Sequence, residues 1–477
     1  MGKGNKKMWL GIVVFIILVF MFVVYFFYPS GVWHTKGKGI SLSIREVPRG
    51  VIRADKVPKT FVVSPDSKRY AYLAKRGDKW LVVVDGEESK EYDMSPVGLI
   101  FSADSHRVAY GSIRGGMQFV VVDGVEGKEY DGIGEPGVIF SPDSRRVAYS
   151  AGRGDKMFVV VDGEEGKEYD GIGEPGVIFS PDSHRVAYLA KRGDKMFVVV
   201  DGVEGKEYDG IGEPGVIFSP DSRRVAYWAM RGDKWFIVVD GEEGKEYDGF
   251  GDLIFSPDSR RVAYSTGRGD KMFVVIDGEE GKEYDEIMEG SPIFSADSRR
   301  VAYSAKRGGK WFVVVDGEEG KEYDGIGAGS LIFSPDSRRV MYSAGRGNKR
   351  FVVVDGEESK GYDGIGAGSL IFSPDSRRVA YSAKRGDKWV VVVDGVEGKE
   401  YDGIGAGSLI FSPDSRRVAY SAKRGGKWVV VVDGVEGKEY GVVLTGSNLV
   451  FDSPTHLHTL AGRGNEVFLL EIDIVEK

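Results

Sequence analysis

Charged turn residues recur through this sequence and are the first candidates for chemistry. Arg-Gly-Asp stands at residues 76–78, 153–155, 192–194, 231–233, 268–270 and 385–387. This tripeptide is typical of adhesion ligands. The other copies of the same turn end instead in Gly116, Gly309, Asn348, Gly426 and Asn465. Because Asp, Asn and Gly share a tolerance of left-handed backbone angles, we interpret the position as a turn residue.

Repeated aspartates and a histidine pair are the next candidates. The aspartate of Ser-Pro-Asp-Ser recurs, as at Asp143, Asp182 and Asp375. A cation needs about 6–8 oxygens together, which copies spread along an array do not provide, so we predict bonds to nearby backbone amides. His456 and His458 would share one face of a strand, but no third ligand stands out. We therefore predict no metal site.

Composition narrows the functional classes further. The chain has no cysteine, and it contains no nucleophile elbow, Walker loop or dinucleotide fingerprint. Its net charge is -8, although the first fifty residues are basic, so the remainder is strongly acidic. An acidic body disfavours general nucleic-acid binding. We predict a protein without catalysis, without a cofactor and without a nucleic-acid partner.

A repeat of about 39 residues organises these motifs. One Phe precedes the Ser-Pro-Asp turn in most copies, with Val63 before the first and a degraded copy around Phe451. The intact copies have this residue at Phe101, Phe140, Phe179, Phe218, Phe255, Phe294, Phe333, Phe372 and Phe411. Eleven starts at a nearly fixed period indicate a solenoid or a propeller.

Each repeat carries four strand signals, which the copy at residues 370–408 shows well. An apolar triplet precedes the turn, an alternating segment follows it, and then come a wholly apolar segment and a short charged one. We expect these strands at 370–372, 378–383, 389–393 and 399–401. The charged fourth strand suits an outer edge that must not recruit other strands. Four antiparallel strands in this length are typical of a β-propeller blade.

The segment Phe-Ser-Pro-Asp-Ser-Arg-Arg-Val-Ala-Tyr resembles the TolB-type, WD-like propeller repeat, over roughly residues 55–470. The same repeat occurs in the non-catalytic propellers of prolyl-oligopeptidase-type peptidases. The glycine usual after the aspartate is serine in the good copies, as at Ser144, and two copies have Ala103 or Ala296 in place of proline. The WD dipeptide is absent. The resemblance implies the blade and does not imply a ligand.

The two ends of the array suggest how it closes. The last repeat has three strand signals and stops, whereas residues 40–45 alternate between apolar and polar before the first repeat. We expect this N-terminal strand to complete the last blade within a propeller domain at 40–477. Eleven blades exceed the usual range of about 4–8. Two arrangements stay open: one large ring, which we favour slightly, or two smaller rings split near 250–290.

The N-terminal residues indicate a membrane anchor. Residues 8–28 carry no charge and are long enough to span a bilayer core of about 30 Å. Three lysines precede the segment, and no convincing cleavage site follows it. We predict a cytoplasmic tail at 1–7, an uncleaved anchor at 8–28, a linker at 29–39 and an extracytoplasmic propeller.

Turn positions predict one basic face. In a four-stranded blade the second-to-third turn lies on one face and the Asp-Gly-Glu-Glu turn on the other. The basic face would include Lys191, Arg192, Lys384, Arg385, Lys423 and Arg424. Such a ring would attract an acidic patch or an anionic polymer. Mixed charge that only keeps the protein soluble is the alternative.

One strand position varies between copies. It holds Trp80, Gln118, Met157, Met196, Trp235, Met272, Trp311, Arg350, Trp389, Trp428 and Val467. We interpret its large side chains as packing between blades rather than as a stack for sugars or peptides. Gln118 and Arg350 break the apolar series and are added to the candidate binding residues.

The functional hypothesis is a membrane-tethered, extracytoplasmic, non-catalytic module that binds a protein or an envelope polymer. Two alternatives stay open. One is a polysaccharide hydrolase or lyase with its site at the tunnel mouth, using residues hidden in the irregular segments 248–292 or 445–465. The other is a sensor or assembly subunit of an envelope complex.

Overall fold

The computed structural model describes residues 39–53, 55–57, 59–444 and 446–476. Residues Ser41–Val475 form one compact unit. The predicted tail at 1–7, the anchor at 8–28 and nearly all of the linker at 29–39 lie outside the described residues. Among the residues that are described, no helix is long and apolar enough to cross a membrane.

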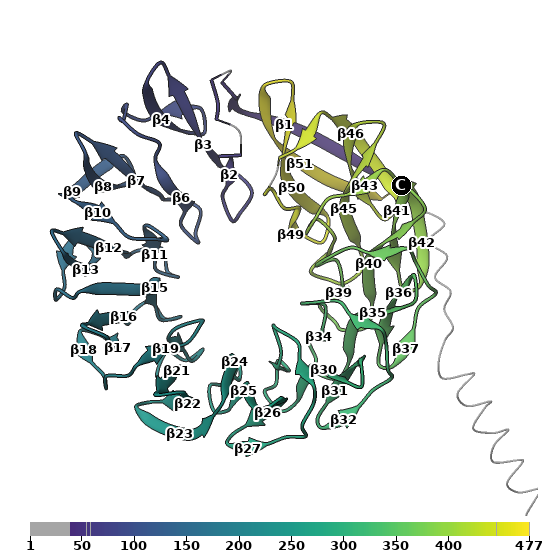
Figure 1. Ribbon diagram of the computed structural model, residues 1–477. Helices are drawn as coiled ribbons and strands as arrows, with labels where there is room; N and C mark the ends of the chain where they lie inside the picture. Colours follow the sequence, from purple (N-terminus) through teal and green to yellow (C-terminus); the bar gives the residue numbers. More distant parts are fainter. Residues whose placement is uncertain (1–38, 54, 58, 445, 477) are drawn as a thin grey trace, which may run out of the picture. The chain divides into compact units, whose positions relative to one another are not determined.

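The unit Ser41–Val475 is a closed ring of antiparallel sheets (Figure 1). Its described residues form eleven sheets and no helix. The first strand of each blade lies towards the centre of the ring and the fourth strand lies outside. The propeller of four-stranded blades is thereby confirmed. The chain forms one ring, and a split near 250–290 does not occur, because Trp228 of blade 5 packs on Tyr264 of blade 6 at 5.2 Å between ring centroids.

The first six blades follow one another along the chain. Blades 1 to 3 comprise β2 (Val62–Val63), β3 (Tyr70–Arg76), β4 (Lys79–Val84) and β5 (Glu87–Glu88); β6 (Val97–Phe101), β7 (Val108–Arg114), β8 (Met117–Val122) and β9 (Val125–Tyr130); and β10 (Gly132–Ile133), β11 (Ile139–Phe140), β12 (Val147–Arg153), β13 (Lys156–Val161) and β14 (Glu164–Glu165). Blades 4 to 6 comprise β15 (Gly171–Phe179), β16 (Val186–Arg192), β17 (Lys195–Val200) and β18 (Val203–Glu204); β19 (Gly210–Ile211), β20 (Ile217–Phe218), β21 (Val225–Arg231), β22 (Lys234–Val239) and β23 (Glu242–Tyr247); and β24 (Gly249–Phe255), β25 (Val262–Arg268), β26 (Lys271–Ile276) and β27 (Glu279–Glu280).

The remaining blades continue the same order. Blades 7 to 9 comprise β28 (Glu286–Ile287), β29 (Ile293–Phe294), β30 (Val301–Arg307), β31 (Lys310–Val315) and β32 (Glu318–Glu319); β33 (Gly325–Ile326), β34 (Ile332–Phe333), β35 (Val340–Arg346), β36 (Lys349–Val354) and β37 (Glu357–Glu358); and β38 (Gly364–Ile365), β39 (Ile371–Phe372), β40 (Val379–Arg385), β41 (Lys388–Val393) and β42 (Val396–Tyr401). Blades 10 and 11 comprise β43 (Gly403–Ile404), β44 (Ile410–Phe411), β45 (Val418–Arg424), β46 (Lys427–Val432) and β47 (Val435–Tyr440); and β48 (Val442–Val443), β49 (Val450–Ser453), β50 (His456–Arg463), β51 (Glu466–Glu476) and β1 (Ile40–Val51).

Blade 9 shows how closely the pattern matches the strands. The predicted segments 370–372, 378–383, 389–393 and 399–401 correspond to β39, β40, β41 and β42, with bounds that differ by up to three residues. The glycine-rich link that follows β42 takes part in the next blade. Its first two residues, Gly403 and Ile404, pair with β45. Each link therefore begins the first strand of the blade that follows it.

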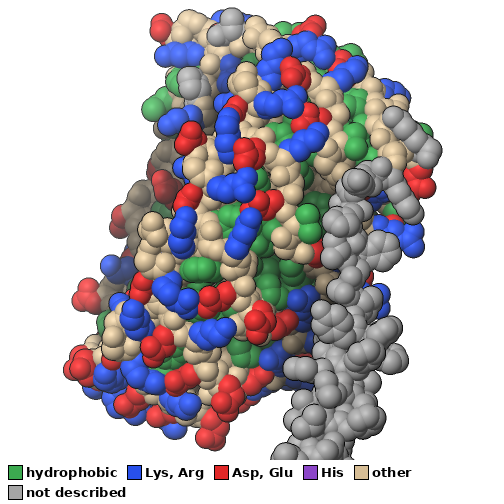
Figure 2. Space-filling view, turned by 90° about the vertical axis from the view of Figure 1, so that its right-hand side faces the viewer, with side chains coloured by type: hydrophobic (Ala, Val, Ile, Leu, Met, Phe, Trp, Pro, Cys, Tyr) green, Lys and Arg blue, Asp and Glu red, His purple; other side chains and the backbone are tan. Residues whose placement is uncertain are grey.

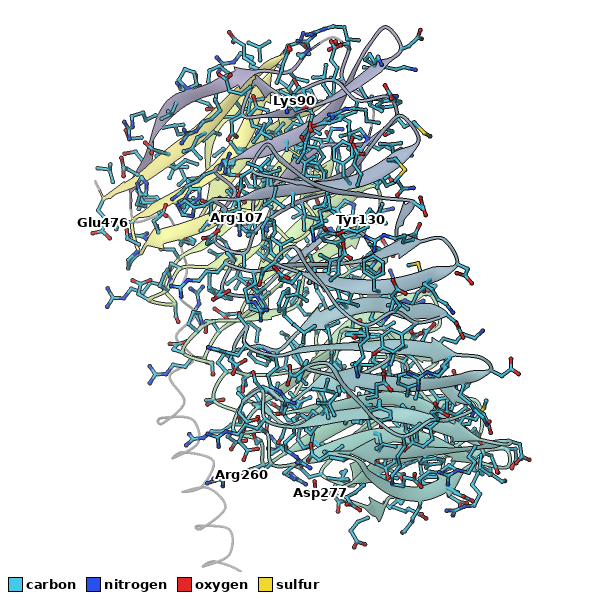
Figure 3. All side chains as sticks on the ribbon, turned by 90° about the vertical axis from the view of Figure 1, so that its left-hand side faces the viewer. Lys90, Arg107, Tyr130, Arg260, Asp277 and Glu476 are labelled. Atoms are coloured by element: carbon cyan, nitrogen blue, oxygen red, sulfur yellow. The ribbon has the colours of Figure 1, made fainter. Side chains whose placement is uncertain are left out.

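Buried aromatic residues join neighbouring blades. Tyr130, at the end of the outer strand of blade 2, is 1% exposed. Its ring lies 6.1 Å from that of Tyr149 and 5.6 Å from that of Phe158, both in blade 3 and both edge-on. Such contacts contribute about 0.5–1.5 kcal/mol beyond the buried area. Figure 3 labels Tyr130 within the layer of blades.

The variable strand position packs between blades, as predicted, where the apolar clusters include it. Met196 lies with Tyr227 of the next blade, Trp235 with Tyr264, Met272 with Tyr303, and Trp311 with Tyr342. These large side chains fill the space between two twisted sheets.

The N-terminal strand closes the ring, which confirms that prediction. Blade 11 has the strand order β1-β51-β50-β48, so β1 is its outermost strand. Glu46 of β1 accepts hydrogen bonds from Tyr440 Oη at 3.0 Å and Arg463 Nη2 at 2.8 Å. In blade 4, Glu204 contacts Tyr169 and Arg192 in the same way. The segment thus reproduces the repeat's contacts without its sequence.

Candidate functional site

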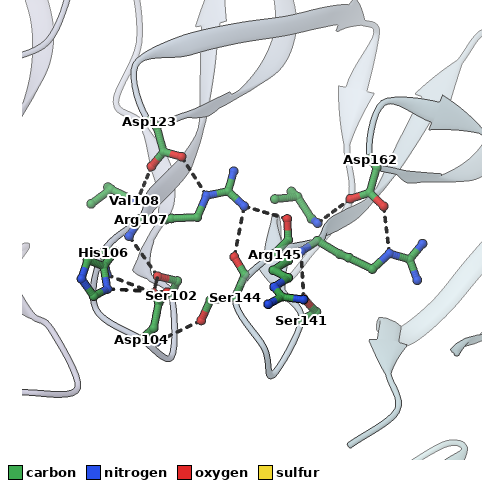
Figure 4. Close-up of polar contacts among 12 residues, drawn as sticks. Ser102, Asp104, His106, Arg107, Val108, Asp123, Ser141, Ser144, Arg145 and Asp162 are labelled. Carbon is green, nitrogen blue, oxygen red and sulfur yellow. Dashed lines mark hydrogen bonds and ion pairs between the residues drawn. The ribbon is translucent and has the colours of Figure 1, made fainter. Parts of the chain in front are cut away.

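The Ser-Pro-Asp-Ser turns bind the chain to itself. In blade 2, Asp104 Oδ1 accepts hydrogen bonds from Ser102 Oγ at 2.6 Å and from the His106 amide at 3.0 Å (Figure 4). The hydroxyl bond and the amide bond lower the pKa of Asp104 because both favour the charged carboxylate. The predicted structural role of this aspartate is confirmed.

The serine that follows each turn aspartate joins two blades. Ser144 has a φ of 66°, in the left-handed region where glycine is the usual residue. Its hydroxyl accepts a hydrogen bond at 2.9 Å from the backbone amide of Asp104 in the preceding blade. A glycine would fit the backbone but would lose this bond. Sequence reasoning recorded the substitution and missed its role.

The second arginine after each turn also reaches the next blade. Arg107 Nε donates to Asp123 Oδ2 at 2.8 Å, and its Nη1 donates to the carbonyls of Ser144 at 3.1 Å and Arg145 at 2.9 Å (Figure 4). The guanidinium also lies 5.1 Å from the Phe140 ring centroid. These arginines therefore bind neighbouring blades to each other, and their guanidinium groups are already hydrogen-bonded within the ring.

The predicted basic face is largely compensated within each blade. Arg192 contacts Glu204 at 3.0 Å and Glu207 at 3.3 Å. Arg385 contacts Glu397 and Glu400, and Arg424 contacts Glu436 at 2.8 Å, in the same manner. The sequence analysis placed the turns that contain Glu204, Glu397 and Glu436 on the opposite face, but these three glutamates lie on the outer strands β18, β42 and β47 and reach back along the blade. Figure 2, which views the ring from its outer side, shows blue and red side chains interspersed there.

The three candidate lysines have other surroundings. Lys191 is exposed at the end of β16, and Lys384 is half-buried at the end of β40. Lys423 lies with its Nζ 6.0 Å from the Trp428 ring centroid. Their role as binding residues stays a prediction.

Gln118 and Arg350 occupy different environments. Gln118 is half-buried, and its Oε1 accepts a hydrogen bond at 2.9 Å from the amide of Ile133 in blade 3. The glutamine thus replaces packing by a polar link between blades. Arg350 is exposed, and its guanidinium lies against Gly345, where a Cβ would approach Nη1 to 2.0 Å. Arg350 remains available at the surface.

The inner edge of the ring is where the copies differ most. The links of blades 3, 4 and 5 expose Glu135, Glu174 and Glu213. Glu174 lies within β15, and the other two lie in the turns between the innermost strands β10 and β11 and between β19 and β20. The equivalent residues are acidic in blades 6 and 7, and they are alanine in blades 8 to 10 at Ala328, Ala367 and Ala406. Consecutive links touch, because a Cβ at Gly176 would lie 3.2 Å from the Glu135 carbonyl oxygen. The two link types were visible in the sequence, but only the fold places them around one edge.

Asp252, at the same inner edge in blade 6, has a raised pKa. It is half-buried, and its Oδ2 accepts the Gly290 amide of blade 7 at 2.9 Å. Burial raises the pKa of Asp252, and the negative charge of Glu289 raises it further. Both residues belong to the irregular segment 248–292 that the sequence singled out.

His456 and His458 both lie close to Asp452. Asp452 Oδ2 lies 2.6 Å from His458 Nδ1 and 3.7 Å from His456 Nε2, so the two imidazoles share a side of β50 as predicted. Within the described part of the chain, no group of three or more acidic or histidine side chains is arranged to hold a metal ion.

Comparisons with known proteins find likeness of fold alone. No protein-family model matches the sequence, and no curated protein matches it. Among solved structures, a eukaryotic initiation factor is 12% identical and covers 76% of this chain and 98% of its own, with a TM-score of 0.39. The propeller domain of the Trilobed protease from Pyrococcus furiosus is 16% identical over 53% of this chain and 91% of its own, with a TM-score of 0.26. TolB from Acinetobacter baumannii is 12% identical over 61% and 78%, with a TM-score of 0.25.

Proposed function

We propose that this protein is a non-catalytic scaffold that binds another protein. The observation that supports this proposal is that the polar groups of the repeat bind other residues of the ring. Turn aspartates, serines and arginines bind neighbouring blades, and outer glutamates neutralise the turn arginines. These contacts build a rigid ring and leave recognition to positions where copies differ, such as Arg350 and the links at the inner edge.

We further propose that residues 8–28 anchor this ring in a membrane with the propeller on the extracytoplasmic side. The support is the uncharged apolar segment itself, which is long enough to span a bilayer core of about 30 Å. Carbonate extraction and protease accessibility of the full chain test the anchor. A chain that washes off membranes at alkaline pH, or whose propeller is shielded from external protease, contradicts it.

Crosslinking in intact cells, followed by solubilisation and pull-down of the full chain, tests the binding proposal. We expect one protein to be enriched reproducibly. The variant K191E/K384E/K423E changes the predicted basic face, and E135A/E174A/E213A gives three links the alanine found in blades 8–10. One of the two should lose the partner while the other keeps it. Enrichment of an envelope polymer without protein, or of nothing, contradicts the proposal.

A polysaccharide hydrolase or lyase is a second candidate, favoured by Asp252 and Glu289. Glycoside hydrolysis uses two carboxyl groups, and the one that acts as the general acid has a raised pKa. An activity screen on cell-wall polysaccharides with the full chain tests this candidate. Turnover that is lost in D252N and kept in D258N, at a turn aspartate, would support it. Absence of turnover favours the scaffold.

A further inference from the structure

At the junction between blade 11 and blade 1, called the seam below, histidines stand where nine of the other junctions have an arginine. At nine junctions an arginine donates Nη1 to carbonyls in the next blade's turn, as Arg339 does to Ser376 and Arg377, each at 3.2 Å. The nine are Arg69, Arg107, Arg146, Arg185, Arg224, Arg261, Arg300, Arg339 and Arg378. In blade 11, the strand register puts His456 at the arginine's position.

His458 makes the contact from blade 11 to the turn of blade 1. It stands where the repeats have a buried alanine such as Ala419, and its side chain is 2% exposed. Its Nε2 lies 2.7 Å from the backbone carbonyl oxygen of Asp66 in blade 1. Its Nδ1 lies 2.6 Å from Asp452 Oδ2. The imidazole therefore lies between two oxygens.

Both of these oxygens are acceptors when Asp452 is ionised. A neutral imidazole carries one N–H and one lone pair, whereas the imidazolium carries two N–H groups. Only the imidazolium donates to Asp452 and to Asp66 at the same time. The ionised carboxylate is the stronger acceptor, so the proton that remains stays on Nδ1 towards Asp452. The Nε2 lone pair then faces the Asp66 carbonyl oxygen at hydrogen-bond distance, which is repulsive.

The charged groups around His458 favour this assignment. Burial raises the pKa of Asp452, but the hydrogen bond and charge of His458, with the charge of Lys68, outweigh burial and leave that pKa lowered. Lys68 Nζ lies 3.6 Å from Asp452 Oδ1. The carboxylate therefore stays ionised in neutral solution, so the proton that is lost as pH rises is the imidazole's.

The remaining neighbours are themselves paired. On β51, Asp473 Oδ1 lies 2.7 Å from His456 Nδ1, and Glu471, which is opposite His458, pairs with Arg45 of β1. The Asp66 carboxylate accepts Ser64 Oγ at 2.5 Å and the Lys68 amide at 3.1 Å. None of these contacts replaces the bond from His458 to blade 1.

We propose that His458 makes closure of the ring dependent on pH: the protonated imidazole fastens blade 11 to blade 1, and its deprotonation loosens this junction alone. The arginines at the nine junctions named above keep their charge throughout the physiological range. An uncharged bond remains at this seam, from the Asn448 amide of blade 11 to Ser67 Oγ of blade 1 at 2.9 Å.

His458 limits the stability of the seam at high pH, and Asp452 limits it at low pH. The contribution of His458 is present when the imidazole is protonated and is lost as pH rises. The pKa of Asp452 is lowered, so its contribution is present above the ordinary aspartate pKa and is lost as pH falls through the lowered value. The seam is therefore tightest between these limits.

Spin labels on the full chain in lipid nanodiscs test the proposal, helped by the absence of native cysteine. Labels at P65C and T455C span the seam, and labels at P374C and R338C span the matched junction held by Arg339. All four positions are exposed. Between about pH 6 and about pH 8.5, we expect the seam distances to lengthen and broaden while the matched pair stays unchanged. A seam distribution that does not change with pH overturns the proposal.

The variant H458Q carries no titratable proton at this site, so its seam should lose the pH response. A pH response retained in H458Q contradicts the proposal. If this variant does not fold, amide hydrogen exchange of the native chain decides. The protection factor of the Asn448 amide, which donates to Ser67 Oγ of blade 1, should fall about tenfold over the same range, while that of the Asp336 amide, bonded to Ser376 Oγ, stays constant. Equal behaviour of the two amides contradicts the proposal.

Discussion

Single residues in this ring gain their roles from the blade beside them. Ser337 has a φ of 65° and is 3% exposed, and its hydroxyl accepts the Asp297 amide of the preceding blade at 2.9 Å. A serine pays a steric cost for that backbone angle, and the bond between blades offsets the cost. The same residue in isolation would be an unfavourable choice for the turn.

Replacing Ser337 separates the bond from the backbone strain. S337A loses the bond and keeps the left-handed angle, so we expect a loss of about 1–2 kcal/mol in unfolding free energy. S337G also loses the bond but relieves the strain, so it should be less destabilised by about 0.5–1 kcal/mol. Urea unfolding measures both, with R338A at the exposed neighbour as the control that changes little. A larger loss in S337G than in S337A contradicts the account.

Elements in this chain are defined by position in the ring more than by their own sequence. The strand β1 does not resemble the repeat's outer strand, yet Glu46 has the same partners as Glu358, namely a tyrosine from the preceding blade and an arginine from its own. The hydrogen bond from Arg463 lowers the pKa of Glu46. The two glutamates are equally accessible, with side chains 20% and 22% exposed.

This match allows closure to be tested against an ordinary blade. E46A and E358A each remove similar contacts, worth about 1 kcal/mol. Because β1 belongs to blade 11 and leads into blade 1, we expect E46A to raise hydrogen exchange in both β51 and β3 by several-fold. The effect of E358A should stay within blades 7 and 8. Identical, local exchange changes in the two variants would show that β1 does not close the ring.

At the scale of the whole molecule, the ring is a set of nearly equivalent junctions. Each blade contacts only its two neighbours, so stability is close to a sum of blade and junction terms. Blade 8 and blade 9 have closely similar sequences, and residues 330 and 369 are both serine followed by leucine. Removing one repeat therefore regenerates a normal junction.

We expect a chain that lacks residues 331–369 to fold into a ring of one blade fewer. The new junction restores the serine, arginine and tyrosine contacts, and the change in angle is shared among all the blades. Electron microscopy of single particles counts the blades. Deletion of residues 350–369, which leaves a partial blade, is the control and should give a protease-sensitive chain. An open arc from the full-repeat deletion contradicts the expectation.

We expect acid to unfold the ring over a narrow range of pH. The hydroxyl bond and then the amide bond lower the pKa of the turn aspartates below the ordinary value of 3.8, as at Asp143, Asp182 and Asp336. A lowered folded pKa means that the stabilisation is present above the unfolded value and is lost as pH falls through the folded one. Circular dichroism along an acid titration measures this loss. Because the cause is hydrogen bonding, added salt should shift the midpoint little.

Sequence by itself determined the blade. The period, the turn residues and the wholly apolar third strand predict β39 to β42 to within three residues, because these signals are local and recur in every copy. Comparison among copies likewise assigned Arg-Gly-Asp and the repeated aspartates to turns. The N-terminal strand was predicted from its alternation and from the missing fourth strand of the last repeat. These conclusions need only the preferences of short segments.

Only the tertiary structure decided what lies between blades. One ring of eleven, the bond from Ser144 to the preceding blade and the pairing of Arg192 with Glu204 depend on the twist between neighbouring sheets, which no local pattern carries. The same holds for His458, which is an unremarkable residue of a degraded repeat until closure places a carbonyl of blade 1 against it. Residues nearly four hundred positions apart meet there because the chain returns to its start.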